Sequence, residues 1–191
     1  MPRTAPLLGL VILGLVIALC ASLPALAHEP DHAADYSRPG LYISGAGYFA
    51  LKSSSAGFPG ADTLSWEPDP ALDFRVGWRE RERLALELDF SWLPSSDGIE
   101  YGNWLLGVNA KFYLAEDRIQ PYLILGAGAM WARPPGAASS EVDWAFRQGI
   151  GVEYYVSHHW ALTAETGFVW GVGQIWKNYF LAVNFGAAYR F

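Results

Sequence analysis

Ten charged side chains are the residues of this sequence best suited to chemistry, and they recur at alternate positions of otherwise apolar segments. In residues 71–79, for example, Asp73, Arg75 and Arg79 alternate with large apolar side chains. The set comprises Asp73, Arg75, Arg79, Glu87, Asp89, Lys111, Arg147, Glu153, Glu165 and Arg190. Five are acids and five are bases. Because an isolated charge is costly where there is little water, this balance predicts a structural network of ion pairs.

Two other groups of residues offer catalytic or metal chemistry. Ser157, His158 and His159 place a nucleophile beside a base, but the three residues lie between two alternating segments, and polar residues are typical of turns. The segment 28–39 contains metal-ligand types at His28, Glu29, Asp31 and His32, but it is polar and contains two prolines, which favours a linker without fixed geometry. We therefore predict no catalytic residue, no metal site and no cofactor.

Pairs of glycines superficially resemble nucleotide-binding loops. None of them stands in a G-x-G-x-x-G frame between a strand and a helix. Glycines in barrel strands permit bending and leave interior space for long side chains, and we prefer that interpretation. The pairs are Gly45/Gly47, Gly126/Gly128, Gly149/Gly151 and Gly171/Gly173.

The elements that must position the charged residues are strands, because the sequence alternates with period two from Gly40 onward. In the third segment, Leu86 and Leu88 share one face while Glu87 and Asp89 share the other. The first, fifth and sixth segments alternate less clearly, and Gln148 falls on the apolar face of the sixth, which indicates a bulge or a register error. The predicted strands are 41–51, 71–79, 84–93, 103–114, 119–132, 144–156, 160–170 and 179–191.

These strands favour a membrane barrel over a soluble sandwich. They are longer than the five or six residues usual in soluble sheets. Short connections alternate with long ones, as expected for periplasmic turns and external loops. Tryptophans gather near the ends of the apolar faces, where a barrel has its aromatic girdle. These are Trp78, Trp92, Trp104, Trp131, Trp144, Trp160 and Trp170. We predict an all-β fold, a transmembrane antiparallel up-and-down barrel of about eight strands.

The N-terminus has the three parts of a secretory signal peptide. Arg3 precedes an apolar run, and the run ends at Ala25-Leu26-Ala27. We predict cleavage after Ala27, a flexible periplasmic lead-in over residues 28–39, and the barrel over residues 40–191. An uncleaved anchor helix and a lipoprotein signal using Cys20 are less favoured alternatives. The chain has a net charge of -6 and scattered basic residues, which argues against a nucleic-acid partner.

The sequence also resembles a known group of proteins. The stretches Ile119-Gln120-Pro121-Tyr122, Leu125-Gly126-Ala127-Gly128 and Gly151-Val152-Glu153-Tyr154-Tyr155 are similar to those of small eight-stranded outer-membrane barrels, such as the outer-membrane protein A transmembrane domain. Trp160-Ala161-Leu162 and the Ala188-Tyr189-Arg190-Phe191 end are similar too. The resemblance implies location in the bacterial outer membrane among its lipids and lipopolysaccharide. It also implies that Tyr189 and Phe191 act as the signal read by the barrel-assembly machinery.

The enzymes within this resemblance are the lipid A deacylase barrels. Their pattern implies a catalytic histidine and serine two residues apart on the late strands, but Gly167–Gly173 contains neither. Eight strands enclose an interior just wide enough for side chains. We expect a monomeric, non-enzymatic barrel that contributes to envelope integrity or presents external loops to a partner. A deacylase-like enzyme and a narrow transporter of small hydrophobic solutes are the alternatives.

Overall fold

The computed structural model describes residues 35–52, 68–93, 103–132, 141–172 and 179–191. The predicted signal peptide, residues 28–34 of the lead-in and the four long connections lie outside these residues. Within the described ranges, no helix is long and apolar enough to cross a membrane.

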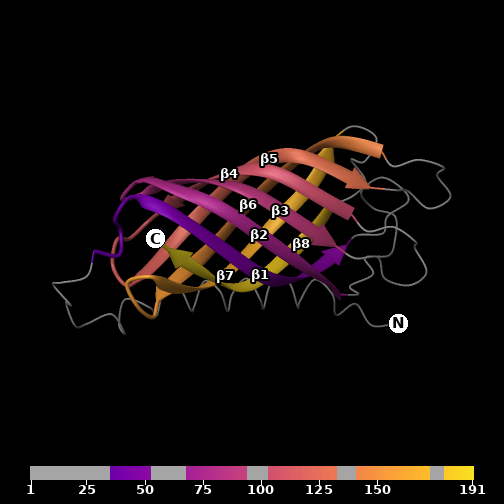
Figure 1. The fold of residues 1–191 in the computed structure, drawn as a ribbon. Coiled ribbons are helices and arrows are strands. Elements are labelled where there is room, and N and C mark those ends of the chain that lie inside the picture. The colour runs from indigo at the N-terminus through magenta and orange to yellow at the C-terminus, as the bar shows by residue number, and fades with distance from the viewer. Residues whose placement is uncertain (1–34, 53–67, 94–102, 133–140, 173–178) are drawn as a thin grey trace.

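Eight antiparallel strands close into one barrel, as predicted (Figure 1). Each strand pairs with its neighbours in the chain, and β8 closes the barrel on β1. The strands are β1 (Gly40–Lys52), β2 (Pro68–Arg81), β3 (Leu84–Leu93), β4 (Asn103–Tyr113), β5 (Ile119–Ala132), β6 (Glu141–Tyr155), β7 (Trp160–Val172) and β8 (Tyr179–Arg190). The bounds of β3 and β5 coincide with the prediction. β2 extends beyond the prediction at both ends and β6 at its start, because backbone pairing continues past the alternating apolar stretch. β6 ends at Tyr155, one residue before the predicted end.

Alternation places apolar side chains outside and polar side chains inside. On β3, Leu86 and Leu88 are about half exposed on the outer surface, at 49% and 54%, whereas Glu87 and Asp89 are buried. Successive side chains of a strand point to opposite faces, so one register decision assigns the whole strand. The large exposed apolar surface is typical of a barrel surrounded by lipid.

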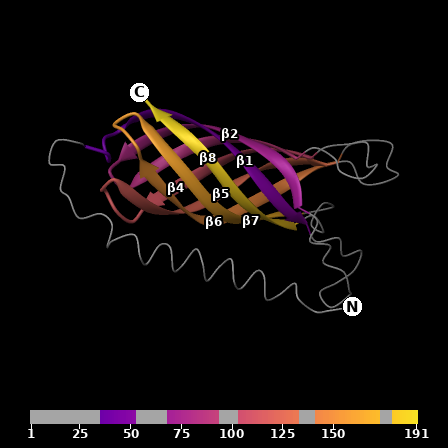
Figure 2. The same ribbon diagram turned by 90° about the horizontal axis from the view of Figure 1, so that it is seen from below.

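The two ends of the barrel differ (Figures 1 and 2). At one end, which we name the turn end, the connections 82–83, 114–118 and 156–159 are short, and β1 begins and β8 ends there. The opposite end, the loop end, is where residues 53–67, 94–102, 133–140 and 173–178 connect the strands.

Part of the predicted flexible lead-in is folded against the turn end. Tyr36 and Ser37 are buried, and the Tyr36 ring packs 5.3 Å from that of Tyr155 and 5.7 Å from that of His158. The Tyr36 carbonyl oxygen accepts hydrogen bonds from inward-pointing side chains of three strands. Residues 35–39 therefore cover the turn end of the lumen rather than hanging free below it.

The Gln148 anomaly is neither a bulge nor a register error. The register of β6 is continuous against both β5 and β7, with Gln148 opposite Leu125 and Phe168. Gln148 is exposed on the outer face. The register shift among the described strand pairs lies instead between Arg79 and Arg81, where β2 approaches its turn.

Two glycines make room for interior tyrosines. A Cβ atom on Gly77 would lie 2.2 Å from the ring of Tyr42, and one on Gly151 would lie 2.4 Å from the ring of Tyr122. The two rings can lie across the neighbouring strand only because these positions have no side chain. These two glycines therefore serve interior packing, as the sequence analysis preferred for Gly151. Gly45 and Gly47 instead lie on the outer face of β1, so that interpretation was wrong for this pair.

Candidate functional site

The lumen gathers the polar side chains and is the candidate functional site. All ten charged residues of the predicted network are buried inside it. Each stands on the face opposite the lipid-facing residues of its strand, and tilted neighbouring strands bring residues distant in sequence together. The chain-distant contacts, such as Arg75 with Glu165, depend on the barrel's closure.

Arg75 is the first centre of the network. Its guanidinium lies 2.5 Å from Asp73, 2.8 Å from Glu165 and 3.4 Å from Glu87. Two of its nitrogens reach the two oxygens of Glu165, at 2.8 and 2.9 Å. Such a two-point contact fixes the planar geometry of both groups.

Arg147 is the second centre. It forms an ion pair with Asp89, lies 2.8 Å from Glu165 and lies 3.4 Å from Asp73. Asn109 donates a further hydrogen bond to Asp89, with Nδ2 3.1 Å from Oδ2. Glu165 and Asp73 therefore each contact both arginines, and the two centres form one cluster.

Lys111 is the third centre, between Glu87 at 2.7 Å and Glu153 at 3.0 Å. Four tyrosine hydroxyls donate further hydrogen bonds to the carboxylates of the network. Tyr42 donates to Glu87 at 2.7 Å, Tyr122 to Glu165 at 2.9 Å, and Tyr113 and Tyr155 to Glu153 at 3.0 and 2.9 Å. The sequence analysis did not include Tyr42, Asn109 or Asn184 in the polar network, although each occupies a position on the polar face.

Arg79 and Arg190 do not pair with carboxylates in the described residues, contrary to the prediction that all ten charges pair with one another. Arg79 donates to Gln120 Oε1 at 2.7 Å and stacks 3.9 Å above the ring of Tyr113. Arg190 donates to the carbonyl oxygens of Tyr36 and Arg38 and to the Tyr155 hydroxyl. Both arginines lie at the turn end, where backbone carbonyls of the folded lead-in replace carboxylates.

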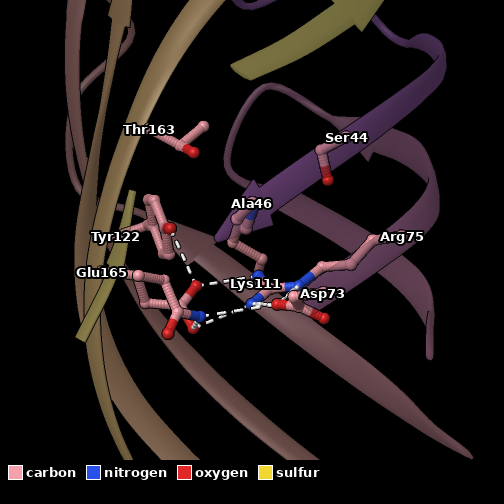
Figure 3. A pocket seen from close by; sticks show the side chains of 9 residues that line it. Ser44, Ala46, Asp73, Arg75, Lys111, Tyr122, Thr163 and Glu165 are labelled. Atoms are coloured by element: carbon pink, nitrogen blue, oxygen red, sulfur yellow. Dashed lines mark hydrogen bonds and ion pairs between the residues drawn. The ribbon is translucent and has the colours of Figure 1, made fainter. Parts of the chain in front are cut away.

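The central network therefore holds five carboxylates and three cations. Among the described residues, hydroxyl and amide donors supply the remaining partners of the carboxylates. A small cavity of about 10 Å³ lies among Ser44, Asp73, Arg75, Glu165 and Asn184, next to Tyr122 and Lys111 (Figure 3). That volume is the minimum for one water molecule. Among the described residues, the network is packed side chain against side chain around this cavity.

A separate layer of apolar side chains fills the loop end of the lumen, and the sequence analysis missed it. Leu105, Met130 and Val169 are almost completely buried there. The signal was present, because inward positions near the loop ends carry Ala, Leu, Met or Val instead of charges. The apolar layer consists of Tyr48, Ala50, Ala71, Leu93, Leu105, Met130, Ala145, Val169, Phe180 and Ala182.

The predicted girdle tryptophans stand on the outer face. Trp78, Trp104, Trp144 and Trp160 are exposed, and Trp92, Trp131 and Trp170 are partly exposed. Trp78 and Trp160 lie near the turn end, and the other five near the loop end. Rings on neighbouring strands pack together, as for Trp92 and Trp104 at 5.8 Å. This distribution matches the two aromatic belts of a membrane barrel.

The C-terminal residues close the barrel. Tyr189 packs 5.0 Å from Trp160 and 5.1 Å from Phe191. The backbone amide of Phe191 donates to the carbonyl oxygen of Leu41 on β1. Both aromatic side chains point outward at the turn end.

The residues considered for catalysis have structural contacts. Ser157 Oγ accepts hydrogen bonds from the backbone amides of His159 and Trp160 and so holds the β6–β7 turn. His159 Nδ1 lies 2.9 Å from the carbonyl oxygen of Arg190. In the described ranges, neither histidine ring is bonded to a serine hydroxyl, and no cluster of three potential metal ligands occurs.

The turns at the turn end of the barrel carry exposed charges. Arg83 and Glu116 form an ion pair at 2.6 Å between the β2–β3 and β4–β5 turns. The hydrogen bond and the charge of Glu116 raise the pKa of the Arg83 guanidinium. The pair is solvent-exposed and links two neighbouring turns outside the membrane-spanning strands.

The closed barrel, apolar outer face and aromatic belts define a transmembrane β-barrel. The profile of the outer membrane protein beta-barrel domain matches residues 13–191, and the chain belongs to that family. Its place is the bacterial outer membrane. No curated protein matches the chain in sequence.

Solved structures share the fold at low sequence identity. Neisserial surface protein A (NspA) superimposes with a TM-score of 0.64 and 16% identity, covering 80% of this chain and 97% of that one. The N-terminal barrel of Pseudomonas aeruginosa OprF gives 0.58 and 11%, covering 81% and 100%. Ail, the attachment invasion locus protein of Yersinia pestis, gives 0.51 and 13%, covering 81% and 100%. At these identities the likeness concerns the fold.

Proposed function

We propose that this protein is a non-enzymatic, closed barrel that anchors its loop-end connections at the cell surface, where they serve envelope integrity or contact a partner. The observation that carries the proposal is the filling of the lumen. The folded lead-in covers the turn end, the charged network occupies the centre, and the apolar layer fills the loop end. A barrel filled in this way suits anchoring better than passage.

The orientation follows from the two ends. The turn end carries short connections and the C-terminus, which suits the periplasm, and the loop end carries the longer connections, which suits the outside. Export requires the signal peptide, with cleavage after Ala27. Lipids and lipopolysaccharide surround the outer face, and the barrel-assembly machinery reads the C-terminal strand. Ail is named for attachment and invasion, roles that surface presentation can serve.

Cysteine labelling in intact cells tests the orientation. With Cys20 replaced by serine, Ser54→Cys in the first long connection should react with a membrane-impermeant maleimide. Asp117→Cys, in the exposed β4–β5 turn, should react only after the outer membrane is opened. The reverse pattern would overturn the proposed orientation and with it the presentation of the long connections.

Two measurements test the closed, non-enzymatic barrel. Purified protein in planar bilayers should give no conductance steps, and lipid A mass spectra should be the same with and without the gene. Altered lipid A would favour the deacylase alternative. As a third measurement, uptake of a hydrophobic dye that depends on the protein would favour the transporter alternative.

A further inference from the structure

The lipid-facing surface carries one polar patch, formed by Gln148 on β6 and Thr166 on β7. Among the described outward-facing residues between the aromatic belts, these two side chains alone are polar and non-aromatic. They are also neighbours, because Gln148 pairs with Phe168 and Ile150 pairs with Thr166 in the continuous β6–β7 register. Two isolated polar residues on the same small area of a lipid-facing surface indicate a site.

The patch lies at the middle of the membrane-spanning surface. Gln148 is the central residue of β6, and Thr166 is the central residue of β7. On the same faces, Trp144 and Trp170 lie toward the loop end, and Tyr154 and Trp160 toward the turn end. The aromatic belts therefore bracket the patch on both sides.

Gln148 has no hydrogen-bond partner among the residues that the structure describes, and its neighbours on the outer face are apolar. Leu125 and Phe146 are 54% and 41% exposed beside it. A carboxamide has two donor hydrogens and a carbonyl acceptor. In hydrocarbon these groups find no water, so leaving them unpaired is costly.

The depth of the patch identifies the kind of partner. Headgroups and sugars lie at the membrane interfaces, and lipid tails at mid-depth offer no hydrogen-bonding group. The partner must therefore be another protein surface that presents polar groups at the same depth. A second copy of this chain meets that condition, since a two-fold axis through the patch places one carboxamide opposite another, and a carboxamide is complementary to itself.

We propose that Gln148 and Thr166 form the centre of a homodimer interface on the outer surface of β5, β6 and β7. Small outward side chains at Ala127, Ala129 and Ala164 allow the two barrels to approach closely. This proposal replaces the monomer expected from the sequence, and it is independent of the function of the loops.

Disulfide cross-linking in isolated outer membranes tests the interface, in a Cys20→Ser background that has no other cysteine. Ile150→Cys introduces a thiol beside the patch and should give a cross-linked dimer under mild oxidation. Val76→Cys is the matched control, because Val76 is also exposed on the lipid face but stands on β2, opposite β6 in the ring of eight strands. It should give no dimer.

The polar groups themselves are tested by adding Gln148→Leu and Thr166→Val to the Ile150→Cys chain. The cross-linked fraction should fall, and sedimentation in detergent should show dimer affinity reduced by about tenfold. Heat-modifiable gel mobility verifies that each variant is a folded barrel. A monomer from Ile150→Cys, an equal yield from Val76→Cys, or a dimer unaffected by Gln148→Leu would overturn the proposal. A disulfide between Ile150→Cys and a different protein would show that the partner at the patch is not a second copy of this chain.

Discussion

The turn-end half of the lumen is filled by charges and tyrosines, whereas the loop-end half is filled by aliphatic and aromatic side chains. The same strand faces contribute to both halves. On β4 the inward side chains change from Lys111 and Asn109 to Leu105. On β7 they change from Glu165 to Val169. A lumen can therefore be closed in two ways, by a network of paired charges and hydrogen bonds or by a layer of packed apolar side chains.

The comparison also explains why the network can be so dense. The apolar layer separates the charges from the loop end, and the lead-in separates them from the turn end. Charges with little water interact strongly, but each then depends on its partners. The polar half should therefore be more sensitive to the loss of single side chains than the apolar half. Three of the four substitutions below test this in the lumen, and the other tests the assignment of the two faces.

Glu165→Ala should have the largest effect. It removes one of the two carboxylates that Arg75 and Arg147 share, and it leaves Tyr122 without its acceptor. Removing one member of a buried ion pair typically costs about 3–5 kcal/mol. The urea unfolding midpoint in lipid vesicles should fall accordingly. Glu116→Ala, which breaks an exposed pair, is the control and should leave the midpoint unchanged.

The Glu165 result also bears on enzymatic activity. Lipid A profiles recorded from the Glu165→Ala strain should match those of the wild type. A variant as stable as wild type with altered lipid A would contradict both the network and the non-enzymatic function.

Leu105→Ala tests the apolar layer. The truncation leaves a cavity in a closely packed lumen, at a cost of about 2–5 kcal/mol depending on how far the site collapses. Leu106→Ala is the matched control. Leu106 is next to Leu105 in the chain but faces lipid, and lipid can fill the space that the truncated side chain leaves. If the two variants unfolded at the same urea concentration, the loop end would not be tightly packed.

Leu88→Arg tests the assignment of the faces. Leu88 is 54% exposed at the middle of β3, so the substitution places a charge in hydrocarbon, at about 2–4 kcal/mol. Ala85→Ser, on the lumen face near the turn end, should cost far less. Folding into vesicles measures both. If the Leu88→Arg variant folded into vesicles and the Ala85→Ser variant did not, the assignment of the lipid and lumen faces would have to be reversed.

Arg79→Met should have the smallest effect of the four. Arg79 hydrogen-bonds to Gln120 and to carbonyl oxygens, so its loss leaves no buried carboxylate unpaired. We expect about 1–3 kcal/mol, the cost of unsatisfied buried acceptors. Exposed Arg81→Met is the control. An effect as large as that of Glu165→Ala would show that Arg79 belongs to the ion-pair network after all.

Much of the fold was predictable because strand alternation is local. Leu86, Leu88, Glu87 and Asp89 reveal their faces by their spacing alone, and one register then fixes the rest of β3. Gln148 shows the limit of this reading. A single polar residue on an apolar face suggested an irregular strand, whereas β6 is regular and the residue itself is unusual.

The ion pairs were less predictable than the charges that form them. Equal numbers of acids and bases suggested full mutual pairing, but Arg79 and Arg190 bind carbonyl oxygens of residues 36–38 instead. The sequence contained no sign that this segment folds back over the turn end, because its contacts are with strands far away in the chain.

The sequence by itself determined the strand count, the two faces and the membrane-facing aromatic belts, since these depend on period-two spacing and residue type. Closure of the barrel decided which charges meet. Arg75 reaches Glu165 on β7, and Lys111 reaches Glu153 on β6, because strand tilt and stagger set the height of every inward side chain. The register between β6 and β7 placed Gln148 next to Thr166 on the lipid side. Spacing along one strand carries no information about height on another, so these contacts belong to the tertiary structure.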